Sequence, residues 1–190
     1  ENAGIAGIQL EDQVMPKKCG HTEGKLLISK DEMVQKIKAA VDARRDPDFL
    51  FVIRTDAIAV NGFDDALDRS LAYEEAGADI IFVEAMQDIE QMKRVAQTFK
   101  KPLLANMVEG GGKTPILPAK ELKAIGFKLA IYPASTWMAA IKAMQELLTI
   151  LKKDGTSLAY QNRMVSFQEM FEVVGRSSYA ALEKKYSSGN

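Results

Sequence analysis

Short apolar runs alternate with longer amphipathic stretches along nearly the whole of this chain. The apolar runs predict strands at 6–10, 49–53, 79–83, 102–105 and 128–132. Helical spacing of apolar residues predicts helices at 31–45, 64–76, 89–99, 118–125 and 135–153, with a helical tail at 166–186. Because the strand runs are continuous rather than alternating, we expect both faces of each strand to be covered, as in a parallel sheet. The chain is therefore expected to form an α/β fold of repeated strand–helix units.

Polar residues recur where the predicted strands end. Glu11, Arg54, Glu84 and Asn106 each follow an apolar run directly. In a (β/α)8 barrel of the TIM type such strand ends line one mouth, where active sites lie. A doubly wound open sheet would spread them along an edge and usually has a glycine-rich phosphate turn after its first strand, which this sequence lacks there. The pattern favours the barrel.

Chain length limits how much of a barrel is present. A complete barrel takes about 250 residues and eight strands, whereas this chain has 190 residues and yields five strand–helix units. We expect that roughly the first three units of about 30 residues each are lacking. Residues 1–190 are expected to form a single domain, in which 134–190 supply a long helix and a helical tail.

Composition excludes several classes of partner. The net charge of −1 gives no electrostatic reason to expect nucleic acid. No apolar run approaches the roughly 20 residues that span a bilayer, so no membrane role is expected. A single cysteine cannot form an intrachain disulfide, and no signal-peptide pattern is present. We expect a cytoplasmic protein, although a cleaved mitochondrial or plastid transit peptide would leave no trace in the sequence.

The only cysteine and the only histidine lie together in the segment Lys17-Lys18-Cys19-Gly20-His21. Nearby cations favour a thiolate, so the pKa of the Cys19 thiol is expected to be lowered. A nucleophile, a metal ligand and a general acid or base are the three roles open to such a thiol. One Cys with one His makes a poor metal site, and a nucleophilic Cys usually has its His distant in sequence. General acid–base chemistry is therefore favoured.

Each candidate residue also has a structural alternative. A single histidine is nearly as often structural as catalytic, and Glu11 with its neighbour could cap the next element. Arg54 could form an ion pair with Asp56 or with Glu84 at the strand ends. The glycines at 110–112 lack the spacing of a phosphate-binding loop, so they indicate a flexible or anion-facing loop. The common placement of these residues carries more weight than any one of them.

Five segments resemble the isocitrate lyase/phosphoenolpyruvate mutase superfamily. They are Gly7-Ile-Gln-Leu-Glu-Asp-Gln13, Pro16-Lys-Lys-Cys-Gly-His21, Ile53-Arg-Thr-Asp-Ala57, Phe82-Val-Glu-Ala85 and Ala105-Asn-Met-Val-Glu-Gly-Gly111. The resemblance spans nearly the whole chain, and the lysine–cysteine–glycine–histidine segment is very specific. The chain is most similar to the branch that contains 2,3-dimethylmalate lyase, methylisocitrate lyase and carboxyphosphonoenolpyruvate phosphonomutase.

The resemblance implies a (β/α)8 barrel that binds Mg²⁺, or Mn²⁺, and cleaves a 2-hydroxy di- or tricarboxylate by a retro-aldol-like reaction. The products would be a 2-oxo acid such as pyruvate and a short carboxylate. Cys19 would act as general acid on a mobile loop, Arg54 would hold the developing oxyanion, and Glu84 would position Arg54. The implied catalytic residues are Lys18, Cys19, His21, Arg54 and Glu84.

The same resemblance implies the remaining site residues and the assembly. Substrate contacts are expected from Cys19, Gly20, His21, Arg54, Glu84, Asn106, Met107 and Val108. Glu11 would support the metal through water, whereas the aspartates that bind it directly would precede residue 1. The chain alone is therefore expected to bind Mg²⁺ poorly and to show little or no lyase activity. The family also implies a homotetramer in which 134–190 exchange between subunits.

Two departures from the family pattern narrow the substrate. Methylisocitrate lyases carry two arginines where Met138 and Phe167 occur here. A tricarboxylate would thereby lose two charge-assisted contacts, each worth about 1.5–3 kcal/mol. This favours an alkyl-substituted malate such as 2,3-dimethylmalate, with a methylisocitrate-like acid less suited. The alternatives are a carboxyphosphonoenolpyruvate phosphonomutase-type enzyme and an inactive truncated chain.

Overall fold

The computed structural model describes residues 1–187. The chain divides into two compact units, residues 1–136 and the residues from 137 onward. We describe each unit by itself. None of the helices in the described part of the chain is both long enough and apolar enough to cross a membrane.

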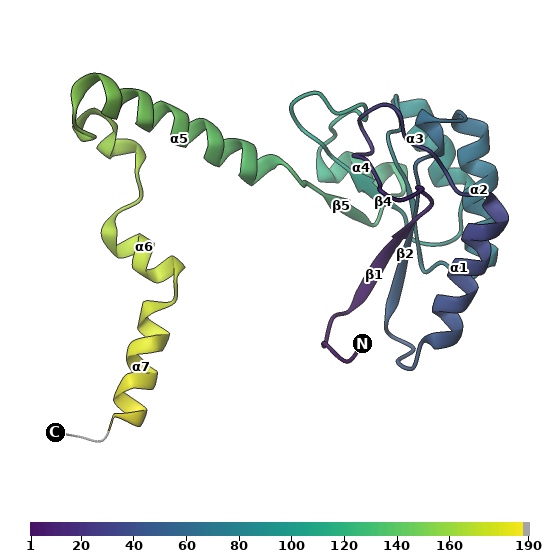
Figure 1. The fold of residues 1–190 in the computed structure, drawn as a ribbon, viewed down its shortest axis with the longest axis horizontal. Coiled ribbons are helices and arrows are strands. Elements are labelled where there is room, and N and C mark those ends of the chain that lie inside the picture. Colours follow the sequence, from purple (N-terminus) through teal and green to yellow (C-terminus); the bar gives the residue numbers. More distant parts are fainter. Residues whose placement is uncertain (188–190) are drawn as a thin grey trace. The chain divides into compact units, whose positions relative to one another are not determined.

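The first unit contains five parallel strands, all within one or two residues of their predicted positions (Figure 1). They are β1 (Gly7–Glu11), β2 (Leu50–Thr55), β3 (Ile80–Val83), β4 (Leu104–Asn106) and β5 (Leu129–Ile131). The first three form one sheet in chain order, and β4 pairs with β5. A single parallel bridge between Ile81 and Leu103 links the two groups. The described residues thus form an α/β fold with parallel strands in chain order, and they do not close a barrel.

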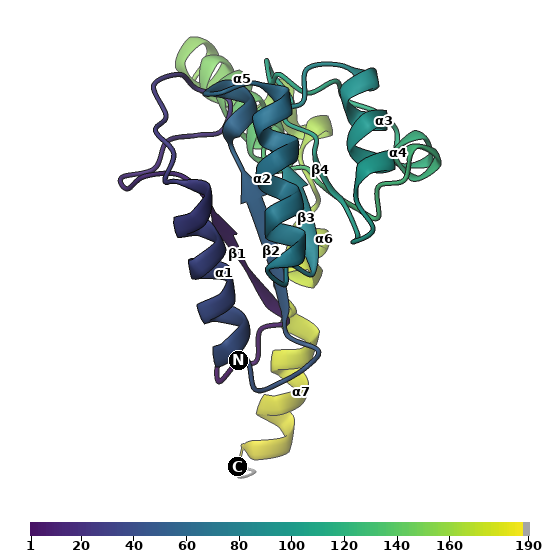
Figure 2. The same ribbon diagram turned by 90° about the vertical axis from the view of Figure 1, so that its right-hand side faces the viewer.

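A helix follows each strand, as predicted. The helices are α1 (Lys30–Ala43), α2 (Phe63–Glu75), α3 (Ile89–Thr98), α4 (Ala119–Ile125) and α5 (Ser135–Asp154). Figure 2 shows α1 and α2 side by side along one face of the sheet. Ser29 and Asp88 cap the first turns of α1 and α3 by accepting hydrogen bonds from the backbone N–H groups of Glu32 and Gln91. Local sequence therefore sets where these helices begin.

The core lies between this helical layer and the sheet. Met33 and Ile37 of α1 and Tyr73 of α2 are fully buried and pack with Phe51 and Ile53 of β2. The opposite face of the sheet is apolar but open. Ile8 of β1 is 37% exposed, and it lines a hollow of about 290 Å³ together with Leu50, Val52, Ile80 and Leu129.

The prediction that every strand is covered on both faces is therefore wrong for β1 and β5. All four residues of β3 are buried, whereas β1 and β5 are partly exposed along their length. The physical reason is that β1 and β5 are outer strands with a neighbour on one edge only, whereas β3 lies between β2 and the segment of β4 within the described residues.

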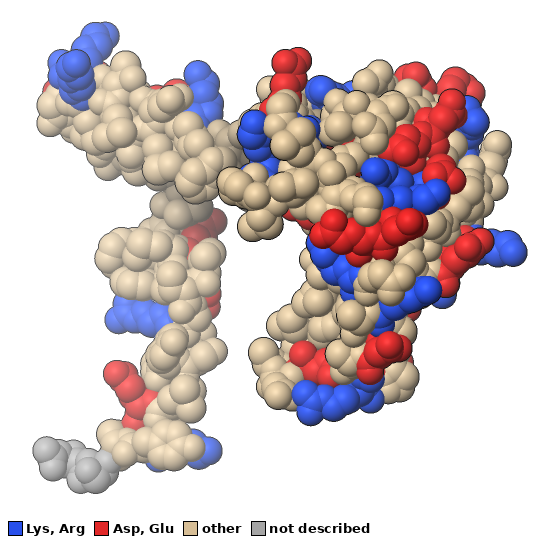
Figure 3. Space-filling view, turned by 45° about the vertical axis from the view of Figure 1, so that its right-hand side comes forward, with Lys and Arg blue, Asp and Glu red and all other residues tan. Residues whose placement is uncertain are grey.

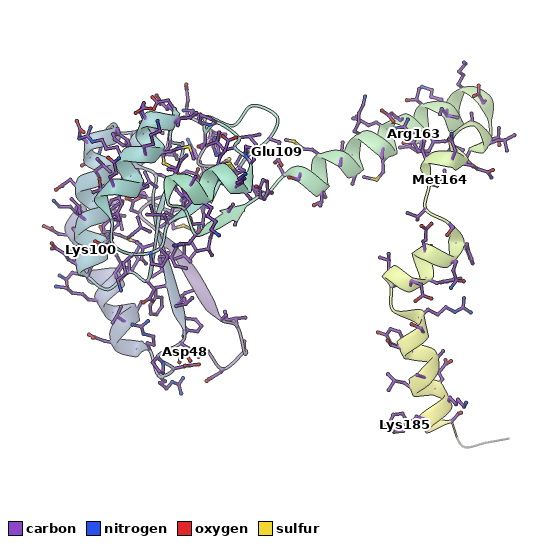
Figure 4. All side chains as sticks on the ribbon, turned by 180° about the vertical axis from the view of Figure 1, so that it is seen from behind. Asp48, Lys100, Glu109, Arg163, Met164 and Lys185 are labelled. Carbon is purple, nitrogen blue, oxygen red and sulfur yellow. The ribbon has the colours of Figure 1, made fainter. Side chains whose placement is uncertain are left out.

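The second unit is helical. Beyond the end of α5 it contains a 3-10 helix, η2 (Leu158–Arg163), then α6 (Phe167–Val173) and α7 (Arg176–Tyr186). The predicted tail helix is thus broken in two, because Gly175 adopts a left-handed conformation with φ of 72°. Arg163, labelled in Figure 4, forms an ion pair with Glu146 of α5.

A buried carboxylate ties the end of β1 to β2 and α2. Asp12 is fully buried, and its oxygens accept hydrogen bonds from Thr55 Oγ1 (2.7 Å), the Asp56 backbone N–H (2.9 Å) and the Tyr73 hydroxyl (3.0 Å). Arg69 Nη1 lies 3.5 Å from the same carboxylate. Burial raises the pKa of Asp12, and these hydrogen bonds oppose that rise. Burial and the neighbouring carboxylate raise the pKa of Tyr73, which keeps its hydroxyl a donor.

Replacing Tyr73 by Phe removes this hydroxyl and keeps the buried ring. We expect the free energy of unfolding to fall by about 1.5–3 kcal/mol, because a hydrogen bond to a charged acceptor is lost. Urea denaturation followed by circular dichroism measures the change. Tyr132→Phe is the matched control, since Tyr132 lies outside the helical segment 134–190 and is 44% exposed, and it should change stability by less than about 0.5 kcal/mol. Equal effects of the two substitutions would contradict this account of Asp12.

Candidate active site

The carboxyl ends of four strands bring four predicted residues together. In the register of the sheet, Glu11 of β1 lies beside Arg54 of β2. Arg54 Nε lies 3.4 Å from Glu11 Oε2, and Arg54 Nη2 lies 3.2 Å from Glu84 Oε2 at the end of β3. Asn106, the last residue of β4, donates from Nδ2 to the same Glu84 oxygen at 3.0 Å. The strand ends therefore form one continuous polar cluster.

Arg54 is the centre of this cluster. It is 8% exposed, and its guanidinium donates two hydrogen bonds of 2.9 Å to the two oxygens of Asp56. The guanidinium also lies over the Phe82 ring, 5.2 Å from its centroid. Burial alone would lower the pKa of Arg54, but the surrounding carboxylates of Asp56, Glu84 and Glu11 raise it. Arg54 is thus a permanently charged donor held in a fixed orientation.

Glu84 is 1% exposed, and both of its carboxylate oxygens have polar partners. Its Oε1 accepts a hydrogen bond from the backbone N–H of Ala85 at 2.8 Å and lies 3.2 Å from His21 Nε2. Ala85 has a φ of 60°, a strained conformation for a residue with a side chain. Although burial opposes ionisation, the contacts with His21, Arg54 and Asn106 lower the pKa of Glu84. An anion is therefore fixed beside the Arg54 cation.

Residues 14–26, which we call the Cys19 loop, reach over this ion pair. A backbone bridge between Gln13 and Leu27 closes the base of the loop. Gly20 is packed so closely that an added Cβ would lie 2.3 Å from Arg54 Nη2 and 2.6 Å from Glu84 Cγ. Only glycine fits at this contact. The free thiol of the adjacent Cys19 is exposed.

His21 connects the Cys19 loop to the loop after β4. Its Nδ1 accepts a hydrogen bond of 3.0 Å from the backbone N–H of Lys113, which follows the glycines at 110–112. Its Nε2 lies near Glu84 but is buried without an aligned hydrogen bond. In the same loop Glu109, labelled in Figure 4, accepts a hydrogen bond from the hydroxyl of Ser135. His21 therefore contacts both the ion pair and a second loop.

The cations that flank Cys19 in sequence have other partners in space. Lys17 Nζ pairs with Glu11 Oε1 at 2.9 Å, and Lys18 Nζ donates to the Gly24 carbonyl at 2.8 Å. Lys17 and Lys18 thus contact Glu11 and Gly24 rather than the Cys19 thiol. Figure 3 shows that Lys and Arg side chains alternate with Asp and Glu side chains over the visible surface of the first unit.

Two residues predicted to contact substrate differ in their surroundings. The Met107 side chain is fully buried in the hydrophobic core, and its sulfur accepts a hydrogen bond from the Leu117 backbone. Val108 is half-buried.

Sequence reasoning gave no role to Lys25, whose ammonium donates hydrogen bonds to the Gly20 and Thr22 carbonyl oxygens inside the Cys19 loop. A single lysine six residues after Cys19 carries no pattern that would reveal this.

The described residues do not by themselves form a metal site. Within residues 1–187 no group of three or more His, Cys, Asp or Glu side chains could hold a metal ion. Glu11 has one buried oxygen without a hydrogen bond, but its carboxylate lies between Lys17 and Arg54. These cations already compensate its charge, so Glu11 offers at most a partial contribution to a bound cation.

Comparison with known proteins places this site in context. The chain is 51% identical over 189 residues to the 2,3-dimethylmalate lyase of Eubacterium barkeri, covering 100% of this chain and 65% of the relative. It is 45% identical over 187 residues to the 2-methylisocitrate lyase of Aeropyrum pernix, covering 98% of this chain and 60% of the relative. The chain thus spans less than two thirds of the length of these relatives.

Solved structures agree with these sequence matches. A crystal structure of 2,3-dimethylmalate lyase superposes with a TM-score of 0.89 at 35% identity, covering 98% of this chain and 62% of that one. A complex of phosphonopyruvate hydrolase with oxalate and Mg²⁺ superposes with a TM-score of 0.77 at 27% identity, covering 97% and 64%. The family model described as phosphoenolpyruvate phosphomutase matches residues 1–152. The chain belongs to this family, within the phosphoenolpyruvate mutase/isocitrate lyase superfamily.

Proposed function

We propose that this chain supplies the acid–base loop and the anion-binding guanidinium of a carbon–carbon lyase. The substrate class is a substituted malate, and the products are a 2-oxo acid and a short carboxylate. The observation that carries the proposal is the seating of Gly20 directly on the Arg54–Glu84 ion pair. Because Cys19 directly precedes Gly20, its thiol would reach the same strand ends, where the buried Arg54 guanidinium could contact an anion. The relatives named as lyases support the same chemistry.

Arg54 is suited to hold a carboxylate or a developing oxyanion. Its guanidinium is charged, buried and oriented before any ligand binds, because Asp56 fixes one edge and Glu84 another. A fixed donor of this kind stabilises charge that develops in a transition state without the cost of reorganisation. Glu84 is then a positioning residue that forms an ion pair with Arg54, and Asn106 acts through Glu84, to which it donates a hydrogen bond.

The proposed cleavage breaks the bond between the hydroxyl-bearing carbon and the adjacent substituted carbon. The hydroxyl passes its proton to solvent water and becomes the carbonyl of the 2-oxo acid, while the bonding electron pair passes to the departing carbon. That carbon would then take a proton from the Cys19 thiol, which completes the short carboxylate. In this direction the thiol must be protonated when the bond breaks, and Cys19 is a free, exposed cysteine that could act as this general acid.

A dialkylmalate such as 2,3-dimethylmalate is the substrate we favour. A 2,3-dimethylmalate lyase is 51% identical to this chain, and Met138 and Phe167 occur where a tricarboxylate would need arginines. A 2-methylisocitrate lyase activity is the nearest alternative, supported by a relative at 45% identity. A phosphonomutase-type reaction is the second, since the matching family model carries that description. An inactive chain is the third.

We include a divalent cation and an assembly in the proposal. Mg²⁺, or Mn²⁺, would polarise the 2-hydroxy carboxylate when bound, with Glu11 contributing through water. A homotetramer that exchanges the helices of 134–190 would cover the many exposed apolar side chains of the second unit, among them Trp137, Leu148, Phe167 and Tyr179. A cytoplasmic location agrees with these assignments and stays part of the proposal.

Cys19→Ser tests the role of the thiol. In the protein that carries this chain, we expect kcat for 2,3-dimethylmalate cleavage to fall about 100-fold or more, because general acid catalysis contributes at least that factor. The melting temperature should stay unchanged, since Cys19 is exposed. A coupled assay for the 2-oxo acid product measures the rate. Full activity of the folded variant would remove Cys19 from the mechanism.

A substrate panel tests the assignment of the substituted malate. We expect kcat/KM for 2,3-dimethylmalate to exceed that for 2-methylisocitrate by about tenfold or more, since the third carboxylate would lack charge-assisted partners. Oxaloacetate completes the panel, and ³¹P spectroscopy with a carboxyphosphonate detects the phosphonomutase alternative. A preference for 2-methylisocitrate would contradict our interpretation of Met138 and Phe167. Failure to turn over any of these compounds would leave only the inactive chain.

A further inference from the structure

Lys25 is a buried cation within the Cys19 loop. Lys25 is 6% exposed, and its ammonium donates hydrogen bonds of 2.6 Å to the carbonyl oxygens of Gly20 and Thr22. Burial lowers the pKa of Lys25, as do the charges of Lys113 and Arg54, while Asp56 opposes them. A buried ammonium costs free energy unless its hydrogens are used. Here two of the three point at one short stretch of loop backbone.

The Lys25 contacts differ from the other hydrogen bonds inside the loop. The Gln13 side-chain amide accepts from the Lys18 N–H and donates to the Lys18 carbonyl, at 2.8 and 2.9 Å. Lys18 Nζ in turn donates to Gly24. These bonds shape the outer part of the loop. Among residues 1–187, the Lys25 ammonium is the one hydrogen-bond donor to Gly20, the residue that packs on Arg54 and Glu84.

We propose that Lys25 is a positioning residue, whose ammonium holds the Gly20 and Thr22 carbonyls and so keeps the Cys19 loop seated on the Arg54–Glu84 pair. Its meaning for catalysis rests on the proposed lyase function, whereas the loop contact rests on geometry alone. Without the ammonium, the Gly20 carbonyl loses its charged donor and the loop backbone is free to lift. Cys19 and His21, which flank Gly20, would then move away from the strand ends together.

The structure supplies two amides that report on this seating. The Thr22 N–H donates to the Cys19 carbonyl within the loop at 3.0 Å. The Lys113 N–H donates to His21 Nδ1 across to the loop after β4, also at 3.0 Å. The first hydrogen bond requires the turn that Lys25 holds to keep its shape, and the second requires the Cys19 loop to stay in place. Hydrogen–deuterium exchange at these amides therefore measures seating without any need for turnover.

The experiment compares exchange in the wild-type protein with Lys25→Met and Lys25→Gln. We expect exchange at Thr22 and Lys113 to be about tenfold faster or more in Lys25→Met, because two hydrogen bonds from a charged donor are lost. Lys25→Gln keeps a neutral donor, so its increase should be smaller. Lys93→Met, which removes an exposed lysine paired with Glu90 on α3, should leave both rates unchanged.

Two results would overturn the proposal. Wild-type exchange rates in Lys25→Met would show that the ammonium does not seat the loop. Faster exchange spread equally through β2 would show a general structural role rather than a positioning one. Where the wild type turns over 2,3-dimethylmalate, Lys25→Met should also lower kcat, and unchanged kinetics would refute the catalytic part. Absence of turnover in the wild type would refute the proposed function, while the exchange comparison would still decide the loop claim.

Discussion

The buried guanidinium of Arg54 is the interaction on which the candidate site depends. It faces Asp56, Glu84 and Glu11, which come from the ends of three strands. Removing this cation would leave Asp56 and Glu84 as buried anions without their partner, a change that typically costs about 3–5 kcal/mol. The same charge arrangement stabilises the strand ends and prepares a donor for a ligand. Structure and proposed chemistry therefore rest on one side chain.

Much of this arrangement follows from sequence position alone. Glu11, Arg54, Glu84 and Asn106 each end a predicted strand, and parallel strands place such residues at the same edge. Their convergence could therefore be predicted before any coordinates. Periodicity also located the five strands and the helices between them, because apolar runs and capping residues act locally. What the sequence could not predict is which side chains pair, since Lys17 and Lys18 flank Cys19 along the chain but contact Glu11 and Gly24 in space.

The errors and omissions share a physical cause, which is dependence on contacts distant in sequence. Ile8 and Leu129 read as core residues, yet they are exposed because β1 and β5 are outer strands with a neighbour on one edge only within the described residues. The acidic pair of Glu11 and its neighbour Asp12 could have capped the next element, and Asp12 is instead a buried acceptor for Thr55 and Tyr73. Lys25 is an ordinary lysine in the sequence and becomes informative only when its ammonium meets the Gly20 carbonyl. Burial and partner choice are tertiary properties, so no local pattern encodes them.

Our central claim is that Gly20 packs directly on the Arg54–Glu84 ion pair and so holds the Cys19 loop over the strand ends. Gly20→Ala tests this claim most directly. An alanine Cβ would lie 2.3 Å from Arg54 Nη2 and 2.6 Å from Glu84 Cγ, so the loop and the ion pair cannot both stay where they are. A crystal structure of the variant measures the outcome. We predict that the Cys19 loop lifts away while Arg54 keeps both hydrogen bonds to Asp56. A variant in which the loop, Arg54 and Glu84 all hold their wild-type positions would contradict the account.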